Sequence, residues 1–227
     1  MMKSCRFAGS NGVLDVPAPD WIVCDELLFS QWGTFLLALI KHGTMETIRR
    51  NEPFSMEPSE FGLLIEGGLF ATDGSDDEGA RVILIQFLKR GDLFSPAIGN
   101  TLQMHLKPHC RTSCLIVRHT AIEAFKADFP AWDRLLPLLW AGMAQAYSQA
   151  VSDSGGRDQD KIHRVLRLMA EHPTATDTKL GREIEAGKQQ IRDLAGVQKR
   201  SATRAFRALE ESGVVSFYGY KRLFFKG

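Results

Sequence analysis

Residues 189–213 of this 227-residue chain read QQIRDLAGVQKRSATRAFRALEESG, and this stretch decides the fold of the C-terminal part. Ile191, Leu194 and Ala195 recur at helical spacing and give a short first helix one apolar face. Gly196 follows them, and a glycine accepts the positive φ that an abrupt helix end requires. Two short helices joined by such a turn are typical of a helix-turn-helix.

The second helix of this motif is expected over residues 199–212, and it is cationic on its outer face, with no acidic residue before Glu210. An arginine or lysine at a guanine edge discriminates by about 1–3 kcal/mol, so this face favours DNA binding; a solvated basic face is the plainer alternative. The predicted buried stripe contains Ala202, Ala205, Phe206 and Leu209. The candidate DNA-binding residues are Lys188, Gln189, Gln198, Lys199, Arg200, Ser201, Arg204, Arg207, Tyr218 and Lys221.

A tight hairpin around Gly219 is expected after this helix, over residues 214–225. Phe217, Leu223 and Phe225 alternate along it and should face the core, which leaves the tyrosine and lysine of the turn available to phosphate. A hairpin in this position is a wing.

Charge is distributed unevenly along the chain. The total is +1, but residues 155–227 hold fifteen basic and nine acidic residues, a net charge of +6. The first 154 residues carry −5. Such an asymmetry is expected when only the C-terminal part meets a polyanion.

Short strands with turn residues between them dominate the N-terminal half, which favours an antiparallel sandwich or barrel-like roll. The fold class is therefore expected to be α+β: an N-terminal antiparallel, jelly-roll-like β-roll, a long dimerisation helix and a C-terminal winged helix-turn-helix. Strands are expected within residues 43–54, 61–72, 81–94 and 109–117, helices within residues 26–42 and 121–129, and an irregular arm over residues 1–20.

Between Trp132 and Ala150, apolar or small residues recur at alternating steps of four and three, which is a heptad pattern. This pattern favours a helix that pairs with its copy in a parallel dimer over an ordinary core helix. Pro137 predicts that this helix starts nearby or kinks there. The turn-rich residues 152–158 separate it from the C-terminal part, so the expected domains are 1–129, 130–154 and 155–227. The predicted dimer interface consists of Trp132, Leu136, Leu139, Met143, Ala146 and Ala150.

At these motifs the chain resembles the Crp–Fnr family of bacterial transcription regulators, which combine a cyclic-nucleotide-binding-type β-roll with a winged helix across a dimer helix. The resemblance is carried by residues 189–196, 201–204 and 209–215, and more loosely by residues 64–68 and 87–94. It implies base reading by Lys199, Arg200 and Arg204. Arg200 stands where many members have glutamate, so a different operator sequence is expected.

The sensing half departs from the family pattern. The resemblance implies a phosphate-gripping cassette over residues 95–109, yet this segment contains no acidic residue and no arginine. The hydroxyl pair that contacts the purine is replaced by Ala150 and Val151. No tight binding of cyclic AMP is therefore expected, no cofactor is predicted, and the effector stays unknown.

Cysteines offer an alternative sensing chemistry. Cys5 and Cys24 lie far apart in the chain, and Cys110 and Cys114 fall on an expected strand, where four residues span about 13 Å, too far for one metal or one disulfide. Cys110 and Cys114 remain the redox candidates. Haem binding would require an iron ligand, for which His42, His105, His109 and His119 are the candidates.

These observations predict a cytoplasmic homodimeric regulator that binds a palindromic site on double-stranded DNA, with RNA polymerase as a candidate further partner and no catalytic residue. The longest apolar run, residues 35–40, is far shorter than the roughly 20 residues of a membrane span. The alternatives are a redox-, haem- or iron–sulfur-responsive regulator, or a ligand-independent protein-interaction module.

Overall fold

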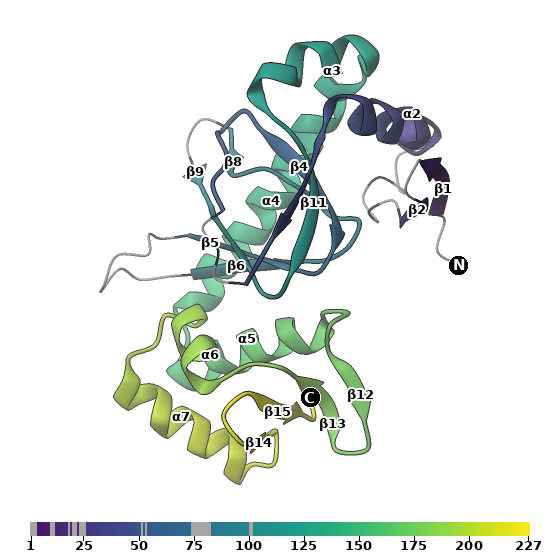
Figure 1. Cartoon of the computed structure of the whole chain (residues 1–227). Helices are drawn as coiled ribbons and strands as arrows, with labels where there is room; N and C mark the ends of the chain where they lie inside the picture. The colour runs from purple at the N-terminus through teal and green to yellow at the C-terminus, as the bar shows by residue number, and fades with distance from the viewer. Residues whose placement is uncertain are drawn as a thin grey trace. The chain divides into compact units, whose positions relative to one another are not determined.

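The structure, a computed structural model, describes residues 4–9, 12–17, 19, 22, 26–50, 52, 54–73, 83–99 and 102–227 (Figure 1). Its contacts divide the chain into two compact units. One comprises Met1–Leu69 and Leu88–Ala144, and the other comprises Phe70–Phe87 and Gln145–Gly227. This division runs through a helix, whereas the domain limits predicted from the sequence lie between elements and remain predictions.

The first unit contains a four-stranded antiparallel sheet in the order β3-β11-β4-β7. β11 (Thr112–Val117) is central and pairs with β3 (Thr44–Ile48) on one side and β4 (Phe61–Glu66) on the other. β7 (Leu93–Phe94) extends the sheet beyond β4. The predicted strands are therefore present, and the end of β11 is buried because it lies between two neighbours.

Further short strands form two smaller sheets. A three-stranded sheet has the order β10-β5-β6, and a separate pair joins β8 to β9. The bounds are Leu69–Asp73 for β5, Ile83–Leu88 for β6, Ala97–Ile98 for β8, Leu102–Gln103 for β9 and His105–Pro108 for β10. Gly67 has a φ of 86° between β4 and β5, which is the turn conformation that the Gly67-Gly68 pair predicted.

Two helices, α2 (Glu26–His42) and α3 (Ile122–Asp128), lie side by side at one end of the roll (Figure 1). Phe35 of α2 meets Phe125 of α3 edge to face, with ring centroids 5.8 Å apart. Phe61 of β4 stacks on Trp132 at 4.0 Å. Interlocking aromatic rings thus fix the helices on the sheet.

A continuous 23-residue helix, α4 (Trp132–Ser154), follows α3 after a short turn. It begins five residues before Pro137 and accommodates this proline, which has no N–H to donate to Asp133. The helix therefore starts at Trp132, about one and a half turns before the proline, and contains Pro137.

The second unit has a core of its own, to which α5 (Asp158–Glu171) contributes. Its residues Ile162, Val165, Leu166 and Met169 are buried, as their helical spacing predicted. A four-stranded antiparallel sheet has the order β12-β13-β15-β14. The remaining bounds are Thr176–Thr178 for β12, Gly181–Ile184 for β13, Lys188–Leu194 for α6, Lys199–Glu211 for α7, Val215–Tyr218 for β14 and Arg222–Phe225 for β15.

Two parts of this fold differ from the sequence-based expectation. The irregular arm predicted over residues 1–20 is wrong, because β1 (Ser4–Gly9) pairs with β2 (Gly12–Pro17) as an antiparallel hairpin. β12 and β13 were not predicted; all three residues of β12 are exposed, so it has no apolar alternation to recognise. None of the helices among the described residues is long and apolar enough to cross a membrane.

Candidate nucleic-acid interface

The turn between α6 and α7 has the geometry that the sequence predicted. Gly196 has a φ of 61°, which a side chain would disfavour. The N–H of Val197 donates to the carbonyl of Arg192 at 3.2 Å, so the chain folds back on α6. The Val197 side chain is 7% exposed and fills the angle between the two helices.

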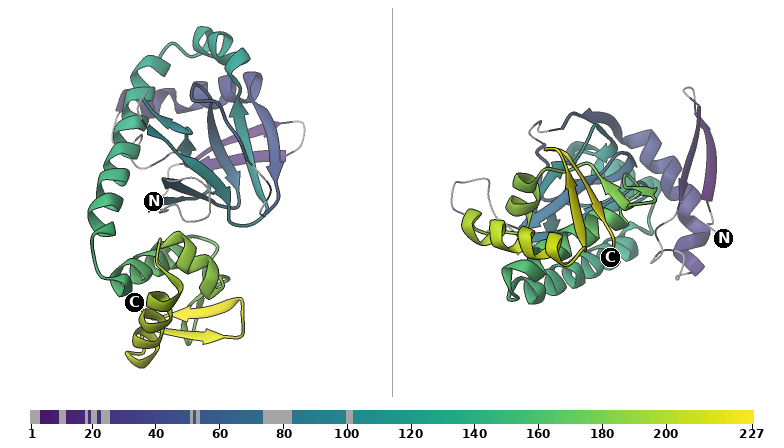
Figure 2. Two further views of the ribbon diagram at one scale, coloured as in Figure 1. Left: turned by 90° about the vertical axis from the view of Figure 1, so that its left-hand side faces the viewer. Right: turned by 90° about the horizontal axis from the view of Figure 1, so that it is seen from below.

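The inner face of α7 anchors this helix in the core. Ala202, Ala205, Phe206 and Leu209 are all buried, which confirms the predicted stripe. Phe206 meets Phe217 of β14 edge to face at 5.4 Å. The left view of Figure 2 shows the β14–β15 hairpin beside α7. Because one face of α7 is fixed in this way, its opposite face is held toward solvent.

Three cations on that outer face lack a compensating acid. Lys199, Arg200 and Arg204 are exposed and have no ion-pair partner within the part of the chain that the structure describes. They lie in the first two turns of α7, where the backbone N–H groups of the helix start add positive potential. Their mutual repulsion costs stability, and a polyanion would remove that cost.

Other predicted contact residues are tied to neighbours. Arg207 forms an ion pair with Glu211 at 2.7 Å, one turn along the helix. The Lys188 ammonium lies 3.3 Å from the Glu210 carboxylate and 4.0 Å from the centre of the Phe217 ring. These contacts make Lys188 a clamp between α6, α7 and β14.

The remaining candidates lie at the rim of the same surface. Gln189 and Gln198 are exposed, and Ser201 is partly buried. Thr203, which the sequence analysis did not single out, is also exposed on α7, and its hydroxyl donates to the Lys199 carbonyl at 2.9 Å. Its position one residue before Arg204 could have suggested it.

The wing presents two exposed tyrosines at its turn. Tyr218 is 70% exposed and Tyr220 is 97% exposed, on either side of Gly219 with its φ of 69°. Lys221 is exposed beside them. Leu223 and Phe225 are buried and Phe217 is partly buried, as the alternation predicted. Tyr220 was not among the predicted residues, although its place in the turn was recognised.

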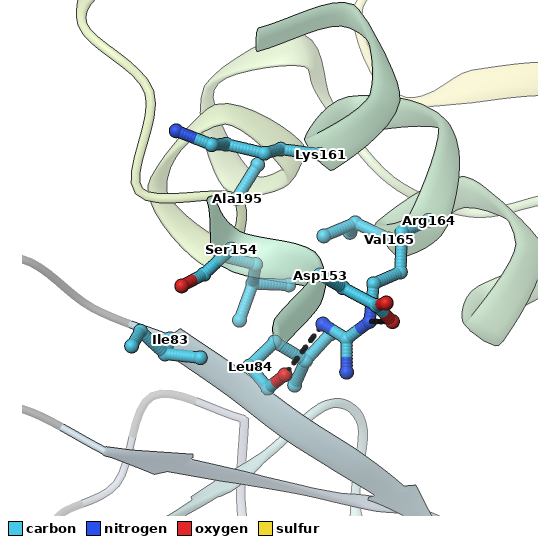
Figure 3. A pocket seen from close by; sticks show the side chains of 9 residues that line it. Ile83, Leu84, Asp153, Ser154, Lys161, Arg164, Val165 and Ala195 are labelled. Atoms are coloured by element: carbon cyan, nitrogen blue, oxygen red, sulfur yellow. Dashed lines mark hydrogen bonds and ion pairs between the residues drawn. The ribbon is translucent and has the colours of Figure 1, made fainter. Parts of the chain in front are cut away.

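A largely buried arginine holds the start of this unit together (Figure 3). The Arg164 guanidinium on α5 pairs with Asp153 near the end of α4 at 3.0 Å and donates to the carbonyl of Leu84 on β6 at 2.7 Å. Burial lowers the pKa of Arg164 from its ordinary value, and the Asp153 carboxylate partly offsets this. A cavity of about 20 Å³, the size of one water, lies beside this pair.

The predicted dimer seam is largely a core face. Trp132, Leu139, Met143 and Ala150 are no more than 6% exposed within their own chain, and Leu136 and Ala146 are partly buried. This corrects the predicted register, because those side chains pack inward, the alternative that the sequence had left open. The exposed stripe on the opposite side of α4 contains Leu138, Ala141, Gln145, Ser148 and Ser152.

The two redox candidates differ in environment. Burial raises the pKa of the Cys114 thiol to about 12, and the nearby Glu46 carboxylate acts in the same direction. The thiolate is the reactive form, so Cys114 is poorly suited to redox chemistry. Cys110 is partly exposed and free. Cys24 lies outside the described residues, as does the side chain of Cys5.

Several solved structures have a similar architecture. The c-di-GMP-responsive global regulator CLP of Xanthomonas campestris superposes with a TM-score of 0.69 at 14% identity, over 86% of this chain and 99% of that chain. FixK2 of Bradyrhizobium japonicum gives 0.62 at 17% identity, over 82% and 93%. No protein-family model and no curated protein sequence matches the chain.

A further match has the same fold. A transcriptional regulator of the crp/fnr family from Eubacterium rectale, described as putative, superposes with a TM-score of 0.67 at 12% identity, over 87% of this chain and 93% of that chain. A β-roll, a long helix and a winged helix-turn-helix thus form one architecture in this chain. It is the fold of the Crp–Fnr regulators, as the resemblance implied.

Proposed function

We propose that this protein is a sequence-specific DNA-binding transcription regulator of the Crp–Fnr type. The observation that carries the proposal is the outer face of α7, where Lys199, Arg200 and Arg204 are exposed without acidic partners among the described residues. A helix anchored on one side and cationic on the other suits the major groove.

In this proposal, α7 enters the groove with its first two turns. Arg200 and Arg204 offer planar forks that match the N7 and O6 acceptors of guanine, and Lys199 offers a point charge. Tyr218 and Lys221 of the wing would contact the phosphates alongside, since both are exposed next to the turn at Gly219. Phosphate contacts position the protein and base contacts specify the site.

The protein would bind as a homodimer through the exposed stripe of α4. Leu138 is 40% exposed there, and Ala141, Ser148 and Ser152 are small enough for a second helix to approach closely. Gly142 is exposed beside this stripe. A Cβ added at Gly142 would have no atom within 4 Å, so a partner helix has room. Two α7 helices set about 34 Å apart would then read a palindromic operator.

Control by cyclic AMP is not part of the proposal. Residues 95–109 offer neither an arginine nor a carboxylate, so this segment has no guanidinium to bind a phosphodiester through two parallel hydrogen bonds. RNA polymerase stays a candidate partner. Binding of cyclic AMP at micromolar affinity in calorimetry would contradict this part of the proposal.

Selection of bound duplexes from a random pool tests the function directly. The selected site should be palindromic, with half-site centres about 10 base pairs apart, and should outcompete a scrambled duplex of equal length by about 10³ or more. The affinity should fall steeply with salt because bound cations release counterions from phosphate. Equal affinity for selected and scrambled duplexes would overturn the proposal.

A further inference from the structure

One cluster of side chains in the first unit has the composition of a metal site and no role in DNA binding. Glu57, Glu60 and His119 each direct one ligand atom into a common space, and these atoms lie within 4.8 Å of one another. It is the one such group of three among the described residues. Glu57 and Glu60 lie in the segment before β4, and His119 follows β11.

The distances from the His119 ring to the two carboxylates are close to those between neighbouring ligands of a small divalent ion. The Nδ1 atom of His119 is 3.3 Å from the Glu57 carboxylate and 3.9 Å from the Glu60 carboxylate. Metal–ligand bonds of 2.0–2.2 Å place tetrahedral ligand atoms about 3.3–3.6 Å apart. The first pair therefore already has the required separation, and the second needs a shift of a few tenths of an ångström. The ligand atoms of Glu57 and Glu60 lie within 4.8 Å of each other, and the exposed Glu57 side chain would close this distance.

Glu60 is the fixed member of the cluster, because its side chain is only 3% exposed. One carboxylate oxygen accepts from the Arg118 guanidinium at 2.8 Å and from the N–H of Glu57 at 3.0 Å. The other oxygen accepts only the N–H of His119, at 3.3 Å, among the contacts described, and faces the imidazole. An orienting donor behind a ligand carboxylate is the usual outer shell of a metal site.

Burial alone would raise the pKa of Glu60, but the N–H of Glu57, Arg118 and the N–H of His119 outweigh it and hold this pKa below its ordinary value. The same donors hold the carboxylate in place beside His119.

The charges around the cluster do not balance. Arg118 also pairs with Glu46, through both its Nε and its Nη2. Two carboxylates, of Glu46 and Glu60, thus share one guanidinium, and the Glu57 carboxylate faces only His119 among the contacts described, which leaves a net charge of −2 when His119 is neutral. A divalent cation would neutralise this excess. Glu57 and His119 are 62% and 53% exposed, so an ion has access from solvent.

The geometry points to a binding site for a divalent transition-metal ion formed by Glu57, Glu60 and His119, with water completing the coordination. One imidazole and two carboxylates suit Zn²⁺ in a tetrahedral site, and Mn²⁺ in a site with more water. The ion would join the segment before β4 to the segment after β11. Bound metal would therefore stabilise the first unit against unfolding.

Calorimetric titration of the chelator-treated full chain with Zn²⁺ and, separately, Mn²⁺ tests the site. One ion per chain should bind, and His119→Ala and Glu57→Gln should each weaken binding by about tenfold or more. Both changes affect exposed side chains, so the variants should fold. His105→Ala, which removes an exposed histidine of β10 outside the cluster, is the matched control and should bind as the unmodified chain does.

A second readout separates the site from adventitious binding. The melting temperature of the unmodified chain should rise with the ion that binds, and this rise should be lost in His119→Ala. The preferred ion follows from which titration gives the tighter binding. Absence of binding for both ions, or equal affinity in His119→Ala and the unmodified chain, would overturn the inference without affecting the proposed DNA binding.

Discussion

We expect two arginines on α7 to contribute differently to DNA recognition. Arg204 and Arg207 are both exposed and lie one turn apart. Arg207 pairs with Glu211 at 2.7 Å, whereas Arg204 has no acidic partner among the described residues. Replacing either by alanine removes one positive charge from the same helix, so the two variants have matched long-range electrostatics.

Arg204→Ala should weaken the binding to the selected operator more than the binding to a scrambled duplex. A bidentate arginine–guanine contact contributes about 1–3 kcal/mol to discrimination, and a homodimer loses it in both half-sites. The affinity for the selected operator should therefore fall by at least about 30-fold. The affinity for a scrambled duplex should fall much less, because it depends on overall charge.

Arg207→Ala should leave specificity intact. Its exposed ion pair with Glu211 contributes at most about 1 kcal/mol, and a DNA contact would require breaking it. Both operator and scrambled affinities should then fall together, with their ratio unchanged. Fluorescence anisotropy titrations of both duplexes at two salt concentrations measure the ratio. If Arg204→Ala keeps the ratio, or Arg207→Ala lowers it equally, the assigned register of α7 is wrong.

Three other predictions concern the Arg164 contacts, the thiols and the dimer. Arg164→Met should lower the free energy of unfolding in urea by about 2 kcal/mol, because it removes the donor to the buried Leu84 carbonyl and the ion-pair partner of the partly buried Asp153 carboxylate; an unchanged midpoint would refute this. In native protein at pH 8, iodoacetamide should modify Cys110 and spare Cys114, as peptide mass spectrometry after quenching reports, and equal labelling would contradict the burial of Cys114. Leu138→Glu should shift light-scattering mass from dimer to monomer, whereas Leu37→Glu, at a leucine of α2 that is 57% exposed against 40% for Leu138, should not; a dimer in both variants would exclude the proposed stripe of α4.

Local patterns were sufficient for the winged helix. The positive φ at Gly196 follows from the glycine itself, and the buried stripe that includes Phe206 follows from the helical spacing of apolar residues in α7. Both patterns lie within a short stretch of sequence. β12 escaped prediction because it is exposed along its whole length, and a strand without a buried face leaves no alternation.

Several properties followed from the sequence by itself: the class of fold, the order of its parts and the cationic face of α7. Each depends on residues within a few positions of one another. The tertiary structure alone decided which side of α4 is free, which arginine of α7 is paired, and that Glu57, Glu60 and His119 meet. These depend on contacts between segments far apart in the chain, since a heptad spacing shows that a helix has a buried face but not what covers it.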